Sequence, residues 1–181
     1  YTKDRINVLG TIVGELDSQG ICVLDAGLYG TRDGYCLDHI IVSDQKGGPL
    51  QISKDQIKEI ESKIINSLEK EKLNPKLVKK KMPRHFLTLK KDTKIEISHD
   101  MKNRWTQLDI KTADRPGLLS SICSVFVKNN ASIKKARIST YGERAEDRFC
   151  ISSLEETPFL KKPALDKLIS ELRESLDPKN H

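Results

Sequence analysis

The strongest constraint on the fold of this chain is an internal repeat, in which one pattern of helix, strand, turn and strand recurs about 110 residues later. A period of this length is that of a small domain, because the units of solenoid proteins are only about 20 to 50 residues long. The sequence therefore predicts two copies of one domain, and their shared interface is a place where a ligand could bind. The aligned pairs include Leu9 with Leu119, Ile12 with Ile122, Ala26 with Ala136, Leu28 with Ile138 and, after one slipped residue, Asp38 with Asp147.

Hydrophobic spacing predicts the elements of each copy. In the first copy, a helix follows residue 7 and stops at Gly20, and Ser53 and Gln56 form a capping box at the start of a second helix. A strand precedes the first helix of the second copy, whereas only three residues precede Asp4, so we expect the first strand of the first copy to be largely missing. The predicted strands are 21–31, 35–42, 105–112, 132–140 and 145–152, and the second copy has helices at 118–129 and from 162.

This order predicts an α+β protein made of two ferredoxin-like (βαββαβ) domains, each an antiparallel sheet with two helices on one face. We place the first domain at residues 1–75, a linker with extra strands at 76–103 and the second domain at 104–181. The linker offers two short strands, 86–89 and 93–98. Either could be the fourth strand of the first domain or fill the open edge of the second.

Composition narrows the function classes. The net charge of +6 raises nucleic acid as a partner, but 26 acidic residues are interspersed with the basic ones and aromatic residues are only 5%, which disfavours base stacking. The basic run at 76–84 is either a solvated linker or a phosphate-binding patch. No apolar run approaches the ~20 residues of a membrane span, and the four cysteines lack zinc-type spacing. We therefore expect a cytoplasmic protein with no metal, membrane or nucleic-acid site.

The segment Asp114-Arg115-Pro116-Gly117-Leu118-Leu119 lies where a strand ends and a helix begins. The first N–H groups of a helix have no internal partner, so this position suits an anion. Gly117 leaves room for the backbone to approach a ligand, and Asp114 could accept hydrogen bonds from an ammonium group. A small zwitterion would match both groups. An ordinary helix start, with proline in the first turn, is the alternative explanation.

Residues 112–119 resemble the β1–α1 signature of ACT domains, which are amino-acid-sensing regulatory modules. Residues 136–147 and 31–38 resemble the second and first ACT domains of bifunctional PII uridylyltransferase/uridylyl-removing enzymes, and residues 83–86 and 176–178 also fit. The resemblance spans nearly the whole chain in the right order. It identifies the chain as similar to the C-terminal tandem ACT region of that family.

The resemblance implies a function. The family's ACT pair senses glutamine and shifts the enzyme between uridylylation of the PII protein and removal of UMP. The catalytic domains, for which Mg²⁺ is expected, have no motif here, so we expect no catalytic residue and no cofactor in this stretch. Implied partners are glutamine, the enzyme's own catalytic domains, the PII protein and a second copy of the chain.

The resemblance also implies the ligand residues. In the second domain these are Asp114, Arg115, Pro116, Gly117, Leu118 and Leu119, with Ser132 and Ile133 facing the same cleft. The matching weaker site of the first domain consists of Asp4, Arg5, Asn7, Cys22 and Val23, where Ile6-Asn7 replaces Pro-Gly.

The sequence leaves open a second function and the roles of three further residues. The alternative function is a ligand-free dimerisation or protein-interaction module of ACT type. The repeated acids Asp38 and Asp147 are interpreted as structural rather than ligand-binding, and Trp105 as a packing residue rather than a ligand contact.

Overall fold

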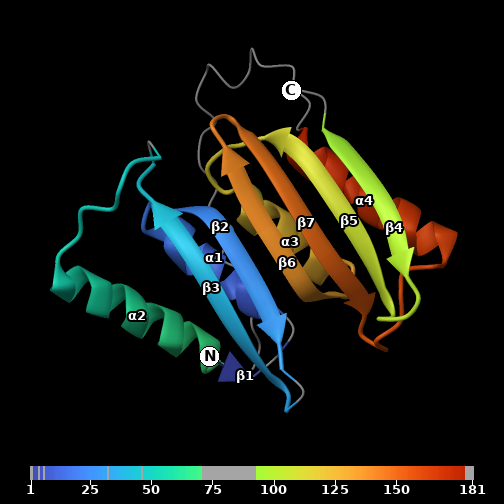
Figure 1. The fold of residues 1–181 in the computed structure, drawn as a ribbon, viewed down its shortest axis with the longest axis horizontal. Coiled ribbons are helices and arrows are strands. Elements are labelled where there is room, and N and C mark those ends of the chain that lie inside the picture. The colour runs from blue at the N-terminus through green and yellow to red at the C-terminus, as the bar shows by residue number, and fades with distance from the viewer. Residues whose placement is uncertain are drawn as a thin grey trace.

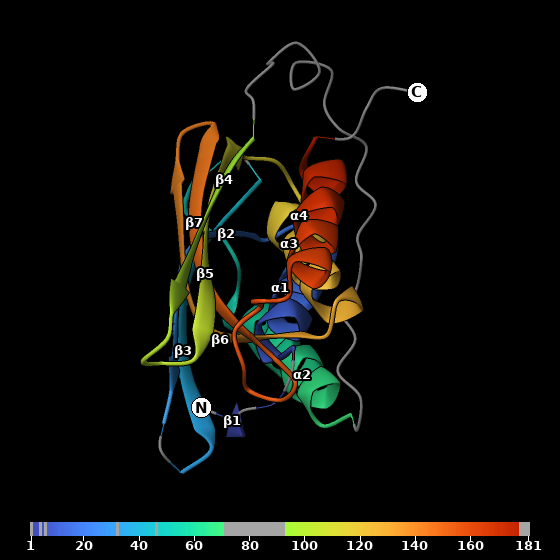
Figure 2. The same ribbon diagram turned by 90° about the vertical axis from the view of Figure 1, so that its right-hand side faces the viewer.

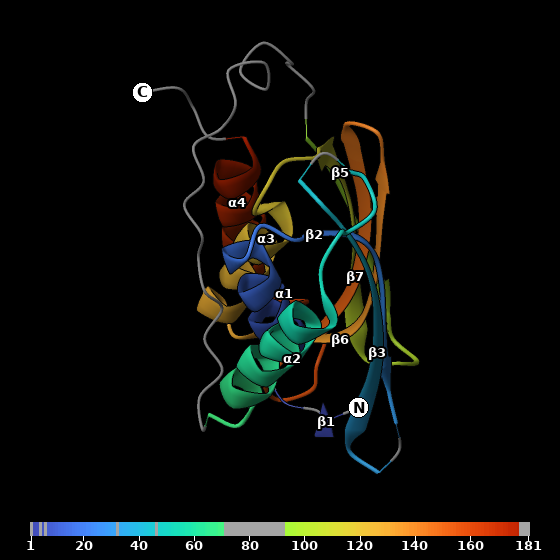
Figure 3. The ribbon, with the colours of Figure 1, turned by 90° about the vertical axis from the view of Figure 1, so that its left-hand side faces the viewer.

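The computed structural model describes residues 2, 3, 5, 7–31, 33–45, 47–70 and 93–177. They form two layers, one continuous sheet and a layer of helices that covers a single face of it (Figures 1, 2 and 3). The predicted α+β class with antiparallel strands is confirmed. No helix among these residues is long and apolar enough to cross a membrane.

The two repeats follow one another along the chain. The first contains β1 (Thr2–Lys3), α1 (Val8–Ser18), β2 (Cys22–Gly30), β3 (Tyr35–Ser43) and α2 (Lys54–Leu68). The second contains β4 (Lys94–Asp100), β5 (Trp105–Ala113), α3 (Leu118–Lys128), β6 (Ala131–Tyr141), β7 (Arg144–Ser153) and α4 (Lys162–Leu176).

The two repeats share one seven-stranded sheet with the strand order β1-β3-β2-β6-β7-β5-β4. They join where β2 pairs antiparallel with β6, with Ala26 opposite Ile138 and Gly27 opposite Arg137. This junction relates the repeats by an approximate twofold axis, so that the start of β2 lies towards the end of β6. Each repeat thereby covers one strand edge of the other, which would otherwise present unpaired backbone groups.

The outer edges of the sheet answer two questions that the sequence left open. Thr2 of β1 pairs with Cys36 of β3, as β5 pairs with β7, so β1 takes the place of the expected first strand. The linker strand is β4, which pairs with β5 and fills the edge of the second repeat. The second repeat is therefore built in the order ββαββα. The other linker candidate, 86–89, lies outside the described residues, as does the basic run.

One hydrophobic core runs beneath both repeats. On β5 the buried residues Thr106, Leu108 and Ile110 alternate with half-buried ones, as the sequence predicted. Phe126 of α3 packs edge-on against Phe149 of β7, with 5.1 Å between the ring centroids. Since the same cluster also includes Leu9, the repeats fold against each other rather than as separate bodies.

Helices α1 and α3 pack at the centre of the helical layer (Figures 2 and 3). Gly10 of α1 marks a close approach, because a Cβ atom there would lie 2.9 Å from the Cβ atom of Cys123 in α3. The hydroxyl of Ser120 in α3 donates a buried hydrogen bond to Asp17 of α1. The glycine that weakens α1 as a helix is thus the residue that lets α3 come close.

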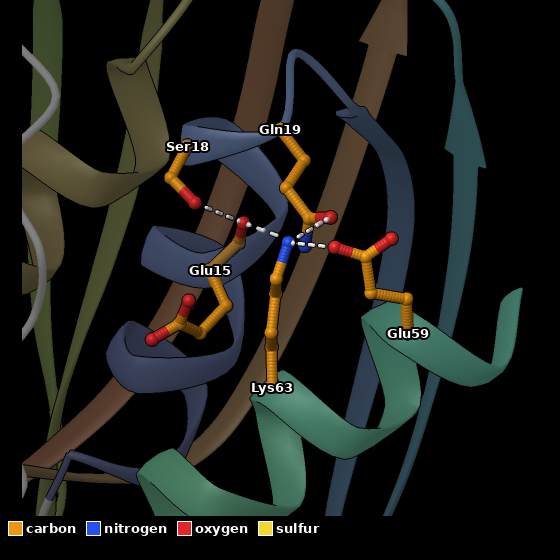
Figure 4. A network of polar contacts seen from close by, with 5 residues as sticks. All are labelled: Glu15, Ser18, Gln19, Glu59 and Lys63. Carbon is orange, nitrogen blue, oxygen red and sulfur yellow. Dashed lines mark hydrogen bonds and ion pairs between the residues drawn. The ribbon is translucent and has the colours of Figure 1, made fainter. Parts of the chain in front are cut away.

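Polar contacts lie at the start of α2 and between α2 and the end of α1 (Figure 4). The capping box predicted at the start of α2 is present, with Gln56 N donating to Ser53 Oγ at 3.2 Å. Figure 4 shows Lys63 of α2 between Glu59, at 2.6 Å, and the Gln19 side chain after α1, at 3.5 Å. These exposed contacts contribute little stability.

Candidate functional site

A cavity of about 360 Å³ lies at the junction of the two repeats. One side is the loop between β5 and α3, and the other is the start of β2 with the end of α1. The cavity is therefore complete only when both repeats are in place. Its lining includes Asp17, Cys22, Val23, the run from Asp114 to Leu119, Ile138, Thr140, Glu143 and Asp147.

The loop between β5 and α3 differs in one respect from the prediction, which placed Pro116 in the first turn of the helix. Helix α3 begins at Leu118, so Pro116 precedes it. Gly117 precedes the helix with φ 78°, a left-handed conformation that a residue without a Cβ atom adopts most easily. Asp114 N donates to Glu143 O at 2.9 Å, which fixes the loop against the turn between β6 and β7. No side chain caps α3, so its N-terminus remains a site for an anion.

The side chain of Arg115 has a structural partner. Its Nη2 atom donates to Ser175 O at 2.7 Å, in the last turn of α4, where the helix dipole is negative. Burial lowers the pKa of Arg115, and the charges of Asp114 and Asp177 oppose this shift. In the first repeat, Arg5 likewise donates to the end of a helix, to the carbonyl oxygens of Leu68, the last residue of α2, and of Lys70. Both arginines thus hold the second helix of their own repeat.

Asp147 lies on β7 and points to the helix-covered face, as Ala145 and Phe149 do. It is only 4% exposed, and its Oδ1 atom has no hydrogen-bond partner within the described part of the chain. Burial raises its pKa to about 7, the charge of Asp114 adds to the rise, and a hydrogen bond from the Ser139 backbone opposes it. The carboxyl is therefore held at the cavity at a cost to the fold.

Asp114 is also affected by its position in the cavity. Burial raises its pKa and the charge of Asp17 adds to this, whereas the Arg115 backbone hydrogen bond and charge lower it. Cys123 of α3 lies near Asp147 and Asp17, and burial raises the pKa of its thiol, so it stays a neutral, buried side chain. The cavity thus carries several acidic groups around one helix N-terminus.

The structure brings together a different set of residues from the one that the sequence analysis assigned to each site. All six residues from Asp114 to Leu119 line the cavity, but Ser132 and Ile133 do not. Cys22 and Val23, expected beside Asp4 and Arg5, line it instead. The expected grouping was wrong for a topological reason. Strands β5 and β6 run in the same direction, so the end of β5 and the start of β6 lie at opposite ends of the sheet.

The counterpart cavity in the other half of the junction is much smaller, at about 20 Å³. Asn7 takes the place of Gly117 there with a similar φ of 73°, and its side chain is buried. Asp4 lies outside the described residues. The lining includes Arg5, Asn7, Val8, Leu9, Asp38, Ile133 and Lys134.

Two acidic residues of the large cavity were not among the predicted ligand residues. The residue equivalent to Asp17 in the second repeat is Val127, so the comparison of the two repeats did not mark Asp17 as a site residue. Asp147 did leave a signal, since Asp38 occupies the equivalent strand position and lines the smaller cavity. An acid repeated on the buried face of a strand is the pattern that could have identified it.

A third depression, of about 460 Å³, lies beyond the end of β2 and contains none of the predicted ligand residues. Tyr29, Arg104, Trp105 and Lys134 contribute to it. Although it is larger than the junction cavity, it lacks that cavity's helix N-terminus and buried acids. Across the described ranges, no three His, Cys, Asp or Glu side chains are placed to hold a metal ion.

Comparison with known proteins gives a consistent picture along the whole chain. The chain is 32% identical over 90% of its length to a bifunctional uridylyltransferase/uridylyl-removing enzyme of Photobacterium profundum. It is 30% identical over 98% of its length to the enzyme of that name from a Psychrobacter species, and 30% over 87% to that of Vibrio cholerae. It spans only about a fifth of these relatives, 18% to 20% of their length. No family model and no solved structure gives a significant match.

Proposed function

Because this chain is homologous along most of its length to one region of the bifunctional uridylyltransferase/uridylyl-removing enzymes, we propose that it is the glutamine-sensing tandem ACT region of such an enzyme. The observation that carries the proposal is the cavity at the junction of the repeats. A ligand bound there touches both repeats at once, which is what a sensor of this design needs.

The chemistry of the cavity suits a free amino acid. The uncapped N-terminus of α3 attracts a carboxylate, and Asp114 can accept hydrogen bonds from an ammonium group. A volume of about 360 Å³ is enough for a molecule the size of glutamine. Pro116 and Gly117 shape the backbone that would lie against the ligand.

Regulation would follow by population shift. Glutamine stabilises the arrangement of the repeats that binds it better, and it can shift the equilibrium only by that difference in affinity. The catalytic domains, which would require Mg²⁺, would respond by changing the uridylylation state of the PII protein. A coupling free energy of about 1–3 kcal/mol is typical of such systems.

A second candidate function is a ligand-free assembly module. Tyr29, Leu37 and Ile41 are each more than half exposed on the sheet face that lacks helices. Apolar side chains gathered on an open sheet face can form a contact with another domain or a second copy. This function and glutamine sensing can coexist in one chain.

A calorimetric titration of the chain with L-glutamine tests the proposal, with L-glutamate and L-serine as comparison ligands. We expect saturable binding of glutamine and loss of that binding in Gly117→Val. The matched control is Gly34→Val, because Gly34 has the same left-handed backbone, with φ 80°, in a turn outside the cavity. No binding by the unmodified chain, or equal loss in both variants, would contradict the proposal.

A further inference from the structure

Asp147 has features that a purely structural carboxyl lacks. It sits on a central strand with 4% of its surface exposed, yet its Oδ1 atom has no hydrogen-bond partner among the described residues. A buried polar atom without a partner is costly, and folded proteins rarely keep one without a reason. The atom belongs to a residue that lines the junction cavity, so a bound molecule can supply the missing donor.

The charged groups that line the junction cavity together with Asp147 are mostly acidic. Asp114 faces it from the β5–α3 loop, Asp17 from α1 and Glu143 from the β6–β7 turn. On α3 the neighbouring titratable group is the neutral thiol of Cys123. Arg115 is the one basic residue in the described lining, and its guanidinium donates to the last turn of α4. Nothing in this set offers a second cation to a ligand that carries a second negative charge.

We propose that Asp147 determines specificity in this cavity by accepting a hydrogen bond from an uncharged side-chain amide and by repelling a side-chain carboxylate. This assignment rests on the proposed function. A glutamine whose main-chain carboxylate lies at the α3 N-terminus and whose ammonium group lies at Asp114 would have its amide N–H₂ group left to pair with Oδ1 of Asp147. At a pH above the pKa of about 7 of Asp147, where its carboxyl is ionised, glutamate in the same pose would set one carboxylate against another.

The physical basis of the discrimination is strong. A like charge placed in a desolvated site is heavily disfavoured, and a site built to bond an N–H group rejects an analogue that lacks it. We expect glutamine to bind on the order of 100-fold more tightly than glutamate. The two ligands differ only in the group that meets Asp147, so their affinity ratio isolates this contact.

The deciding variant is Asp147→Asn, which keeps the size of the side chain and removes its charge. The asparagine oxygen can still accept from glutamine, while its N–H₂ group can now donate to glutamate. We expect glutamine affinity to change by less than about 5-fold and the glutamine-to-glutamate affinity ratio to fall by at least about 10-fold. Asp38→Asn is the matched control, since Asp38 occupies the equivalent strand position at the 20 Å³ cavity. It should leave the ratio unchanged.

Calorimetric titrations of the three proteins with both amino acids, at a pH of about 8.5 where Asp147 is ionised, separate the outcomes. Urea unfolding establishes that each variant is folded. An unchanged ratio in a folded Asp147→Asn variant overturns the specificity role and leaves glutamine sensing intact. Equal weakening of both ligands also overturns it, because Asp147 would then be meeting a group that the two share. Failure of the unmodified chain to bind glutamine refutes the proposed function itself, and this assignment with it.

Discussion

Gly10 tests the central contact of the molecule, because replacing it by alanine sets two effects of opposite sign against each other. Alanine is the better helix former by about 1 kcal/mol in a helix interior. At this position, however, the new Cβ atom would lie 2.9 Å from the Cβ atom of Cys123 and would also meet the buried side chain of Asn7. Carbon atoms in contact normally lie about 3.5–4.0 Å apart, so α1 and α3 would have to separate.

The cost of the overlap is expected to prevail. Adding a methyl group to a well-packed core costs about 1–3 kcal/mol, and here the obstacles are a Cβ atom and a buried amide. After subtraction of the helix-propensity gain of about 1 kcal/mol, Gly10→Ala should lower the free energy of unfolding by up to about 2 kcal/mol. Urea denaturation followed by circular dichroism measures this change.

A double-mutant cycle with Cys123→Gly identifies the cause. Removing the Cβ atom of Cys123 relieves the contact between the helices and leaves the contact with the Asn7 side chain. The double variant should therefore be more stable than the sum of the two single effects by about 1 kcal/mol. The reasoning would be refuted if Gly10→Ala stabilised the protein, or if the two effects were additive. Stabilisation would mean that the overlap costs less than the helix-propensity gain, and additivity would mean that the contact with Cys123 is not the source of the cost.

Three further changes follow from the junction cavity. For Asp147, whose pKa of about 7 lies above the ordinary 3.8, folding favours the protonated carboxyl, so its contribution to stability falls as pH rises from about 4 to 7 and is constant above. As pH rises over that range, the unfolding free energy of Asp147→Asn relative to that of the unmodified protein should therefore increase by up to about 4 kcal/mol. A difference in unfolding free energy that does not change with pH would contradict this. Arg115→Met should cost about 1.5–3 kcal/mol in urea unfolding by removing the charged donor to Ser175 O, whereas an unchanged midpoint would show that the bond contributes nothing. Gly117→Ala should cost about 1–2 kcal/mol through left-handed backbone strain, and Gly117→Asn less, because Asn7 already adopts this conformation in the first repeat; equal costs would rule out strain as the cause.

Several local features were predictable because their physics is local. The spacing of apolar residues predicted α2 and β5, and the capping box at Ser53 and Gln56 is present. Helix starts and strand faces depend on groups within a few residues, so neighbouring sequence is sufficient to identify them.

The partners of each element were harder to predict. From the sequence, the linker strand could complete the sheet of either repeat. In the structure this strand, β4, pairs with β5 and so belongs to the second repeat. The resemblance implied that Ile133, which opens the next strand, faces the same cleft as Asp114. The strand directions place them at opposite ends of the sheet.

By itself, then, the sequence determined that there are two similar αβ units and that one of them starts its first helix with an open, glycine-containing turn. Only the tertiary structure decided that the cavity is shared, because the antiparallel pairing of β2 with β6 brings Cys22 of one unit to Asp114 of the other. It also decided that Asp147 faces that cavity without a partner for its Oδ1 atom among the described residues. The physical reason is that a hydrogen-bonded strand register links residues more than a hundred positions apart, and no local pattern records which edge will pair with which.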